Sequence, residues 1–132
     1  MRGLDTNILV RYLAGDDAKQ TALAGELMEQ SSRRGEQLFI PLIVLCELVW
    51  VLSKSYAQTK PVIVRALDEI LETKLFQIES DLLVRRSLDA FRTGRGDFAD
   101  YLIGEICHAA DCQGCITMDR GLAGAAGFTL LR

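Results

Sequence analysis

Several acidic residues stand where the surrounding sequence favours apolar side chains or simple helix caps. Glu47 is the most informative, because the other ten residues of the segment 42–52 are apolar. A helix that is apolar on all sides is buried, and an unpaired carboxylate placed there costs several kcal/mol or takes up a proton. A buried ion pair with an arginine or a partly exposed helix edge would also explain Glu47. We favour a metal ligand.

Three aspartates, Asp5, Asp100 and Asp119, can be grouped with Glu47. Asp5 follows a short strand at the start of the chain and can serve as a helix cap, while Asp119 suits a turn. Asp97 and Asp100 form a capping pattern, although Asp100 also precedes the apolar middle of a helix. Each aspartate has an ordinary structural explanation when it is taken alone. A single cluster made by Asp5, Glu47, Asp100 and Asp119 explains all four together.

Such a cluster predicts a specific chemistry. Carboxylates within a few ångströms of one another stay ionised only if cations neutralise them. Oxygen ligands favour hard divalent ions, so we expect Mg²⁺, with Mn²⁺ as a possible substitute. One or two such ions can activate water and stabilise the attacking and leaving oxygens of a phosphodiester displacement.

The elements that must position these acids follow from periodicity, caps and breakers. A helix should begin after Asp5, and Asp97 should cap another that runs through Ala110. The remaining helices are expected at 16–34, 41–56, 59–73 and 81–91, and strands at 1–4, 38–40, 74–78, 113–118 and 128–131. The strand at 113–118 is expected to be buried, and the basic turn 93–96 to be mobile. Strands separated by helices indicate an α/β fold with a central, mostly parallel sheet between two layers of helices, a three-layer α/β/α sandwich. Ligands of such sheets bind beyond the carboxyl ends of the strands, where Asp5 and Asp119 lie.

The composition bounds these interpretations. A chain of 132 residues with 49% hydrophobic and 25% charged residues is a folded globular protein, and we expect a single domain over residues 1–132. The longest apolar stretch is too short to span a bilayer, so we expect a cytoplasmic protein. The net charge of −3 argues against a nucleic-acid partner, but four acids in a metal site would leave 14 acids against 15 bases elsewhere.

Other motifs carry less weight. The pair Cys112 and Cys115 has redox spacing, but it precedes a strand, whereas a reactive pair starts a helix. We expect small buried thiols there, in the reduced state, rather than a redox or zinc site that also uses Cys107 and His108. His108 is the only histidine and is expected to be structural, and no Gly-Lys-Ser phosphate loop is present.

Taken together, the chain resembles PIN-domain ribonucleases of the VapC toxin type over nearly its whole length. Each matching motif is short, and the specificity lies in their order and spacing. The motifs are Leu4-Asp5-Thr6-Asn7-Ile8-Leu9, Glu47-Leu48, Asp97-Phe98-Ala99-Asp100 and Thr117-Met118-Asp119.

This resemblance implies an α/β/α fold and a metal-dependent endoribonuclease that cleaves RNA. Its divalent-metal site is made by Asp5, Glu47, Asp100 and Asp119. It also implies a homodimer and a cognate small antitoxin protein. Four residues match positions that support the acids, namely Thr6, Asn7, Asp97 and Thr117. The first strand departs from the pattern, because it carries Arg2 and Gly3 where apolar residues are usual.

Two other functions share part of this pattern. A receiver domain or a haloacid-dehalogenase-like phosphatase also places aspartates and Mg²⁺ at strand ends. Receivers need a lysine near the last strands, and the last lysine here is Lys74; the phosphatases need an aspartate where Asn7 stands. The second rival is a catalytically silent PIN-like module that binds RNA or protein, which a metal titration would distinguish.

Overall fold

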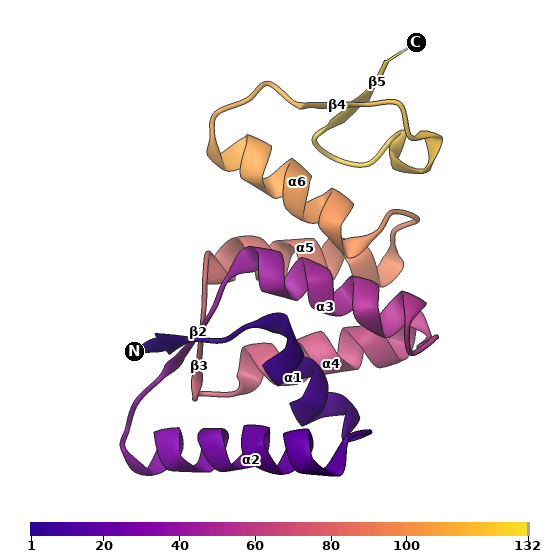
Figure 1. The fold of residues 1–132 in the computed structure, drawn as a ribbon. Coiled ribbons are helices and arrows are strands. Elements are labelled where there is room, and N and C mark those ends of the chain that lie inside the picture. Colours follow the sequence, from indigo (N-terminus) through magenta and orange to yellow (C-terminus); the bar gives the residue numbers. More distant parts are fainter. Residues whose placement is uncertain (132) are drawn as a thin grey trace. The chain divides into compact units, whose positions relative to one another are not determined.

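Short parallel strands alternate with helices along the chain. The structure, a computed structural model, describes residues 1–131 and is shown in Figure 1. The chain divides into two compact units, Met1–Asp81 and Leu82–Arg132. All the strand pairs described within residues 1–131 are parallel, which confirms the predicted α/β class.

The first unit contains a three-stranded sheet in the order β1-β2-β3. In its register Gly3 faces Phe39 and Ile40 faces Ile78, so the carboxyl ends of the three strands meet at one edge. The elements of this unit are β1 (Arg2–Gly3), α1 (Thr6–Ala14), α2 (Ala18–Arg33), β2 (Leu38–Ile40), α3 (Leu42–Lys54), α4 (Lys60–Glu72) and β3 (Phe76–Ile78).

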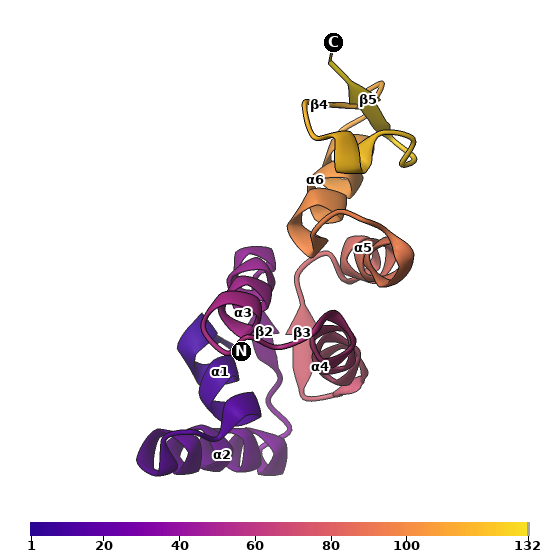
Figure 2. The same cartoon turned by 90° about the vertical axis from the view of Figure 1, so that its right-hand side faces the viewer.

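The helices of the first unit pack through their apolar faces. Figures 1 and 2 show α1 between α2 and α3, and the contacts between these helices agree with that placement. The most deeply buried side chains come from α1, β2, α3 and α4, at 0–2% exposure, and include Leu9, Leu38, Ile40, Leu45, Leu48, Leu67 and Ile70. This core fixes the edge of the sheet where Asp5 follows β1.

The second unit consists of α5 (Asp81–Thr93), which begins at its boundary, α6 (Phe98–Ala109), β4 (Cys115–Thr117), a 3-10 turn η1 (Arg120–Leu122) and β5 (Phe128–Leu130). Phe91 and Phe98 meet edge to face, with ring centroids 6.1 Å apart. β4 pairs with β5, and Cys115 faces Phe128. The sequence predicts a buried β4, but Ile116 on this strand is 69% exposed, so that expectation is wrong for its central side chain.

The predicted elements agree closely with the observed ones, and two local details differ. Pro41 is the N-cap of α3 rather than part of its first turn. β1 carries Arg2 on an exposed edge, where its guanidinium pairs with Glu36 at 2.9 Å, which explains why an apolar residue is not required there. None of the helices within residues 1–131 combines the length and apolar character needed to span a bilayer.

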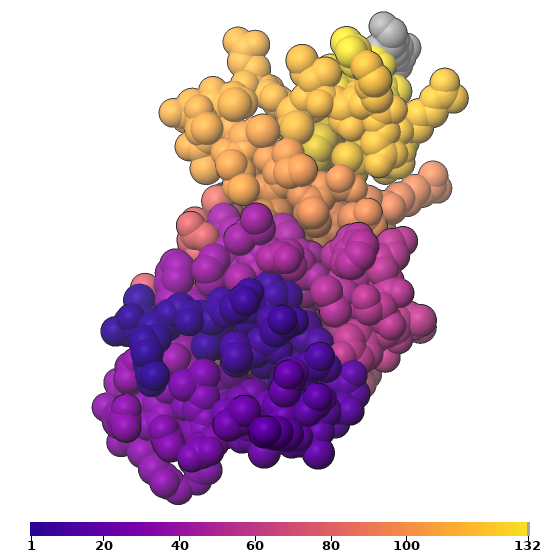
Figure 3. Space-filling view, in the orientation of Figure 1, coloured from indigo at the N-terminus to yellow at the C-terminus, as the bar shows by residue number. Residues whose placement is uncertain are grey.

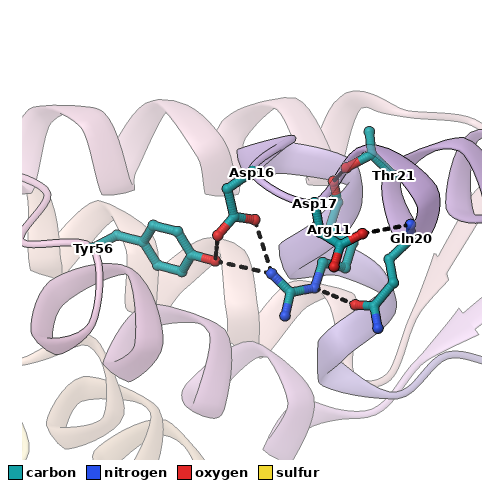
Figure 4. A network of polar contacts seen from close by, with 6 residues as sticks. All are labelled: Arg11, Asp16, Asp17, Gln20, Thr21 and Tyr56. Atoms are coloured by element: carbon teal, nitrogen blue, oxygen red, sulfur yellow. Dashed lines mark hydrogen bonds and ion pairs between the residues drawn. The ribbon is translucent and has the colours of Figure 1, made fainter.

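A polar network holds the turn between α1 and α2 against the end of α3 (Figure 4). Arg11 Nη1 donates to Asp16 Oδ1 at 2.8 Å, and the Tyr56 hydroxyl donates to Asp16 Oδ2 at 2.8 Å. Arg11 Nε also donates to Gln20 Oε1 at 2.6 Å. The hydrogen bond from Tyr56 is the largest cause that lowers the pKa of Asp16, followed by the bond from Arg11, while desolvation opposes both.

The network predicts a pH-dependent contribution to stability. Because the pKa of Asp16 is depressed in the folded protein, its contribution is present above the unfolded pKa and is lost as the pH falls through the folded pKa. Tyr56→Phe should therefore lower the urea midpoint at neutral pH, and the difference from wild type should shrink at about pH 3 and below. Urea unfolding at both pH values measures it.

Tyr12→Phe is the matched control, because Tyr12 lies on α1 with 44% exposure and outside this network. A Tyr56→Phe variant whose midpoint equals that of wild type at neutral pH would contradict the assigned role of the network.

Candidate metal site

Two of the predicted acids meet at one residue in the first unit. Asp5 is the N-cap of α1, and its Oδ1 accepts the Thr6 N–H at 2.7 Å. The hydroxyl of Thr6 donates to Glu47 Oε1 at 3.1 Å, although the two residues are 41 positions apart in the sequence. Thr6 is buried, so a fixed side chain joins the carboxyl edge of β1 to the middle of α3. The backbone N–H of Thr6 therefore binds Asp5, and its hydroxyl binds Glu47.

Glu47 is exposed, so the prediction of a buried carboxylate is wrong. It lies on an open face of α3 together with Ile43 and Trp50, which are 69% and 61% exposed. These residues are spaced four and three positions apart and therefore share one side of the helix. Because ten of the eleven residues 42–52 are apolar, the sequence does not indicate which face of the helix is left without a neighbour. The alternative of an exposed helix edge describes the observed position.

A further acid, Glu79, follows β3 at the same edge of the sheet. Its Oε1 accepts the N–H of Leu42 at 2.8 Å, which satisfies one of the free amides at the start of α3. This role of Glu79 could not be predicted from the sequence, because Glu79 and the start of α3 are 37 residues apart and no local pattern connects them. Its carboxylate acts as a helix cap from outside the helix.

In the second unit, Asp97 and Asp100 form the start of α6. The backbone N–H of Asp97 donates to Asp100 Oδ2 at 2.9 Å, the half of a capping box that the third helical residue supplies. Asp97 is the N-cap, as predicted. Asp100 is half-buried and retains its second carboxylate oxygen for another ligand.

Asp119 lies just beyond the carboxyl end of β4. Its Oδ1 accepts the N–H of Gly121 at 2.8 Å, and its own N–H donates to Thr117 Oγ1 at 3.0 Å. A Cβ on Gly121 would stand 3.1 Å from Asp119 Oδ1, so a side chain there would crowd the carboxylate. The Thr117 hydroxyl thus holds the turn after β4 by accepting the backbone N–H of Asp119.

Close packing joins the two turns of the second unit. A Cβ on Gly96 would lie 2.5 Å from Leu122 Cδ2, which places the loop before Asp97 against the 3-10 turn after Asp119. The Tyr101 hydroxyl also accepts the N–H of Gly96 at 3.0 Å. The basic turn 93–96, which the sequence predicts to be mobile, is therefore held in place. The role of Tyr101 could not be predicted from the sequence. A buried tyrosine hydroxyl is expected to form a hydrogen bond, but nothing in the sequence identifies Gly96 as its partner.

In the first unit the structure brings Asp5 and Glu47 together on Thr6. In the second unit it places the loop before Asp97 against the turn after Asp119, through Gly96 and Leu122. Within residues 1–131, no three histidine, cysteine or acidic side chains are grouped so that they could hold a metal. Asn7 is exposed at the start of α1, and its supporting role stays a prediction.

Comparison with known proteins shows which family this chain matches. Residues 4–127 match the PIN domain, and this range contains all four acids. The chain is also 31% identical over 102 residues to the VapC ribonuclease of Aquifex aeolicus (strain VF5), which covers 77% of this chain and 75% of the relative. The chain belongs to the PIN domain family. It is a homologue of a VapC ribonuclease, and the family resemblance predicted from the sequence is confirmed.

The bond between Thr6 and Glu47 can be measured in this PIN domain with a double-mutant cycle. Thr6→Val removes the hydroxyl and preserves the branched shape, while Glu47→Ala removes the acceptor. We expect a coupling of about 1 kcal/mol between the two changes in the free energy of unfolding, since the bond is charge-assisted but its acceptor is exposed. Denaturant unfolding of the two single variants and the double variant supplies it. Additive effects would mean that the two side chains do not interact.

Proposed function

We propose that this PIN domain is a metal-dependent endoribonuclease that hydrolyses RNA phosphodiester bonds. The observation that carries the proposal is the pairing of Asp5 and Glu47 on Thr6, in a chain whose PIN match spans all four acids. Its named relative is a ribonuclease. We infer that Asp5, Glu47, Asp100 and Asp119 hold one metal centre.

The donor set fits a hard divalent ion. All four ligands are carboxylates, and Asp5, Glu47 and Asp119 are exposed while Asp100 is half-buried. Their exposure leaves oxygens that a partly hydrated ion can reach, which suits Mg²⁺ or Mn²⁺ better than a softer metal. When bound, such an ion supplies Lewis-acid stabilisation of phosphoryl oxygens and lowers the pKa of water.

The residues around the acids would position them for this reaction. The Thr6 hydroxyl donates to Glu47 Oε1, which favours one position of that carboxylate oxygen. Asp97 holds one oxygen of Asp100 through its backbone, and Thr117 fixes the turn of Asp119. Fixed ligands reduce the reorganisation that a metal site would otherwise require.

Exposed arginines stand beside the acids of the second unit and could contact RNA phosphates. Arg95 lies in the loop before Asp97, and Arg120 directly follows Asp119. Arginine pairs with phosphate oxygens through two parallel hydrogen bonds. Other arginines have acidic partners, including Arg11 with Asp16, Arg33 with Glu29 and Arg92 with Asp89. We infer that Arg95 and Arg120 guide the RNA backbone.

We also propose a homodimer, a cognate small antitoxin and a cytoplasmic location, as the resemblance to VapC toxins implies. A hollow of about 300 Å³ lies between α1 and α2, whose surface Figure 3 shows in indigo and violet. Apolar side chains such as Ile8, Leu23 and Leu27 line it beside Arg11, and Leu23 is 59% exposed. A helix with an apolar face and an acidic residue would match this surface.

The proposed activity predicts cleavage of unstructured RNA that depends on a divalent ion. RNA should be cut in the presence of Mg²⁺ or Mn²⁺ and spared when EDTA is in excess, with the fragments resolved by gel electrophoresis. Within this assay, Asp100→Asn should reduce cleavage by orders of magnitude, because the amide lacks the anionic oxygen that a hard cation prefers. The helix cap should survive, since the asparagine oxygen can still accept the Asp97 N–H.

Asp97→Asn is the matched control, because asparagine caps a helix nearly as well as aspartate. Its cleavage rate should stay within about threefold of wild type. Equal cleavage in EDTA would point to another mechanism. A dead Asp97→Asn variant beside a fully active Asp100→Asn variant would transfer the ligand role to Asp97.

A further inference from the structure

Three of the four cysteines gather where α6 ends and the chain turns into β4. Cys107 lies in the last turn of α6, Cys112 in the following loop and Cys115 at the first position of β4. All three are free thiols, and Cys112 is exposed while the other two are partly exposed. The expectation of buried thiols is therefore wrong for Cys112. The fourth, Cys46, lies on α3 in the other unit.

The backbone brings Cys107 and Cys112 together through a defined helix terminus. Asp111 adopts a left-handed conformation with φ 63°. The N–H of Cys112 donates to the carbonyl of Cys107 at 3.0 Å, and the N–H of Asp111 donates to the carbonyl of His108 at 3.0 Å. These two bonds and the left-handed residue form a Schellman motif, in which the side chains at the positions of Cys107 and Cys112 characteristically meet.

The thiols also interact through their sulfur atoms. The pKa of Cys107 is raised above its ordinary value, mainly by its hydrogen bond with the Cys115 thiol and then by desolvation, whereas a hydrogen bond with Cys112 acts in the opposite direction. Cys107 is therefore the residue that the other two share. A sulfenic acid condenses with a neighbouring thiol to form a disulfide, and Cys107 is the neighbour of Cys112 in the Schellman turn.

We propose that Cys107 and Cys112 are an oxidation site, in which a hydroperoxide converts the two thiols to a disulfide that closes the Schellman turn. In the first step Cys112 loses its proton, and the thiolate attacks the terminal peroxide oxygen. The S–O bond of a sulfenic acid forms as the O–O bond breaks, and the departing alkoxide or hydroxide takes up that proton to leave as an alcohol or water. In the second step the Cys107 sulfur displaces hydroxide from that sulfenic acid. The S–S bond forms, and the Cys107 proton leaves with the hydroxide as water.

The position of the pair separates this chemistry from the proposed metal centre. Asp100 is in the first turn of α6 and Cys107 in its last turn, while Asp119 follows the far end of β4. The disulfide would tie the end of α6 to the loop that leads into β4.

Peptide mapping of the whole oxidised chain tests this pairing. After treatment with hydrogen peroxide and alkylation of the remaining thiols, cleavage before aspartate separates residues 100–110, which hold Cys107, from residues 111–118, which hold Cys112 and Cys115. We expect these two fragments to be linked, with the alkyl group on Cys115. Two of the four thiols should be lost, and the melting temperature should rise relative to the reduced chain.

Variants complete the test. Cys46→Ser and Cys115→Ser should retain the bond between Cys107 and Cys112, whereas Cys107→Ser should leave Cys112 to oxidise further to sulfinic acid. Several results would overturn the proposal: a bond from Cys115 to either partner, a dimer joined through Cys112, or four free thiols after peroxide treatment. Capture of Zn²⁺ by the reduced chain that blocks the oxidation would instead assign the cluster to a metal.

Discussion

Parallel pairing of β1, β2 and β3 is the constraint on which the first half of the site depends. Parallel strands end at a common edge, so Asp5 after β1 and Glu79 after β3 lie at the same side of the sheet, where α3 begins. The sheet leaves the N-terminal amides of α3 at this edge, and Glu79 satisfies one of them. Glu47 is carried there by the same helix and is held by Thr6. The geometry of the Asp5 and Glu47 pair thus follows from strand direction.

In the second unit, tight turns rather than a sheet edge hold the acids in place. Asp100 is held by the backbone of the residue that caps its own helix, and Asp119 by the turn that follows β4. Gly96 allows the two turns to pack closely, because a Cβ there would stand 2.5 Å from Leu122 Cδ2 and the Leu122 side chain would have to shift. Each acid therefore has one oxygen occupied by a backbone or hydroxyl donor, an arrangement that limits side-chain motion and leaves the second oxygen for another partner.

Local signals explain which features could be predicted from the sequence. Caps, breakers and short apolar runs gave the order of the elements, the N-cap roles of Asp5 and Asp97 and the four acids that the PIN match contains. Burial could not be predicted in the same way. Glu47 and Ile116 both lie in apolar segments, and their exposure depends on which neighbours the fold supplies to each face. Contacts across long separations, such as Glu79 with Leu42, have no signature in a single sequence.

The central proposal is that Asp5, Glu47, Asp100 and Asp119 hold one ion, and Mn²⁺ binding to the whole chain tests it most directly. Free Mn²⁺ can be followed by electron paramagnetic resonance for wild type, Glu47→Gln, Asp119→Asn and the control Asp97→Asn. The proposal predicts that Glu47→Gln and Asp119→Asn each weaken binding at least about 10-fold, while the control binds like wild type. Wild-type affinity in either of the two variants would contradict a shared centre.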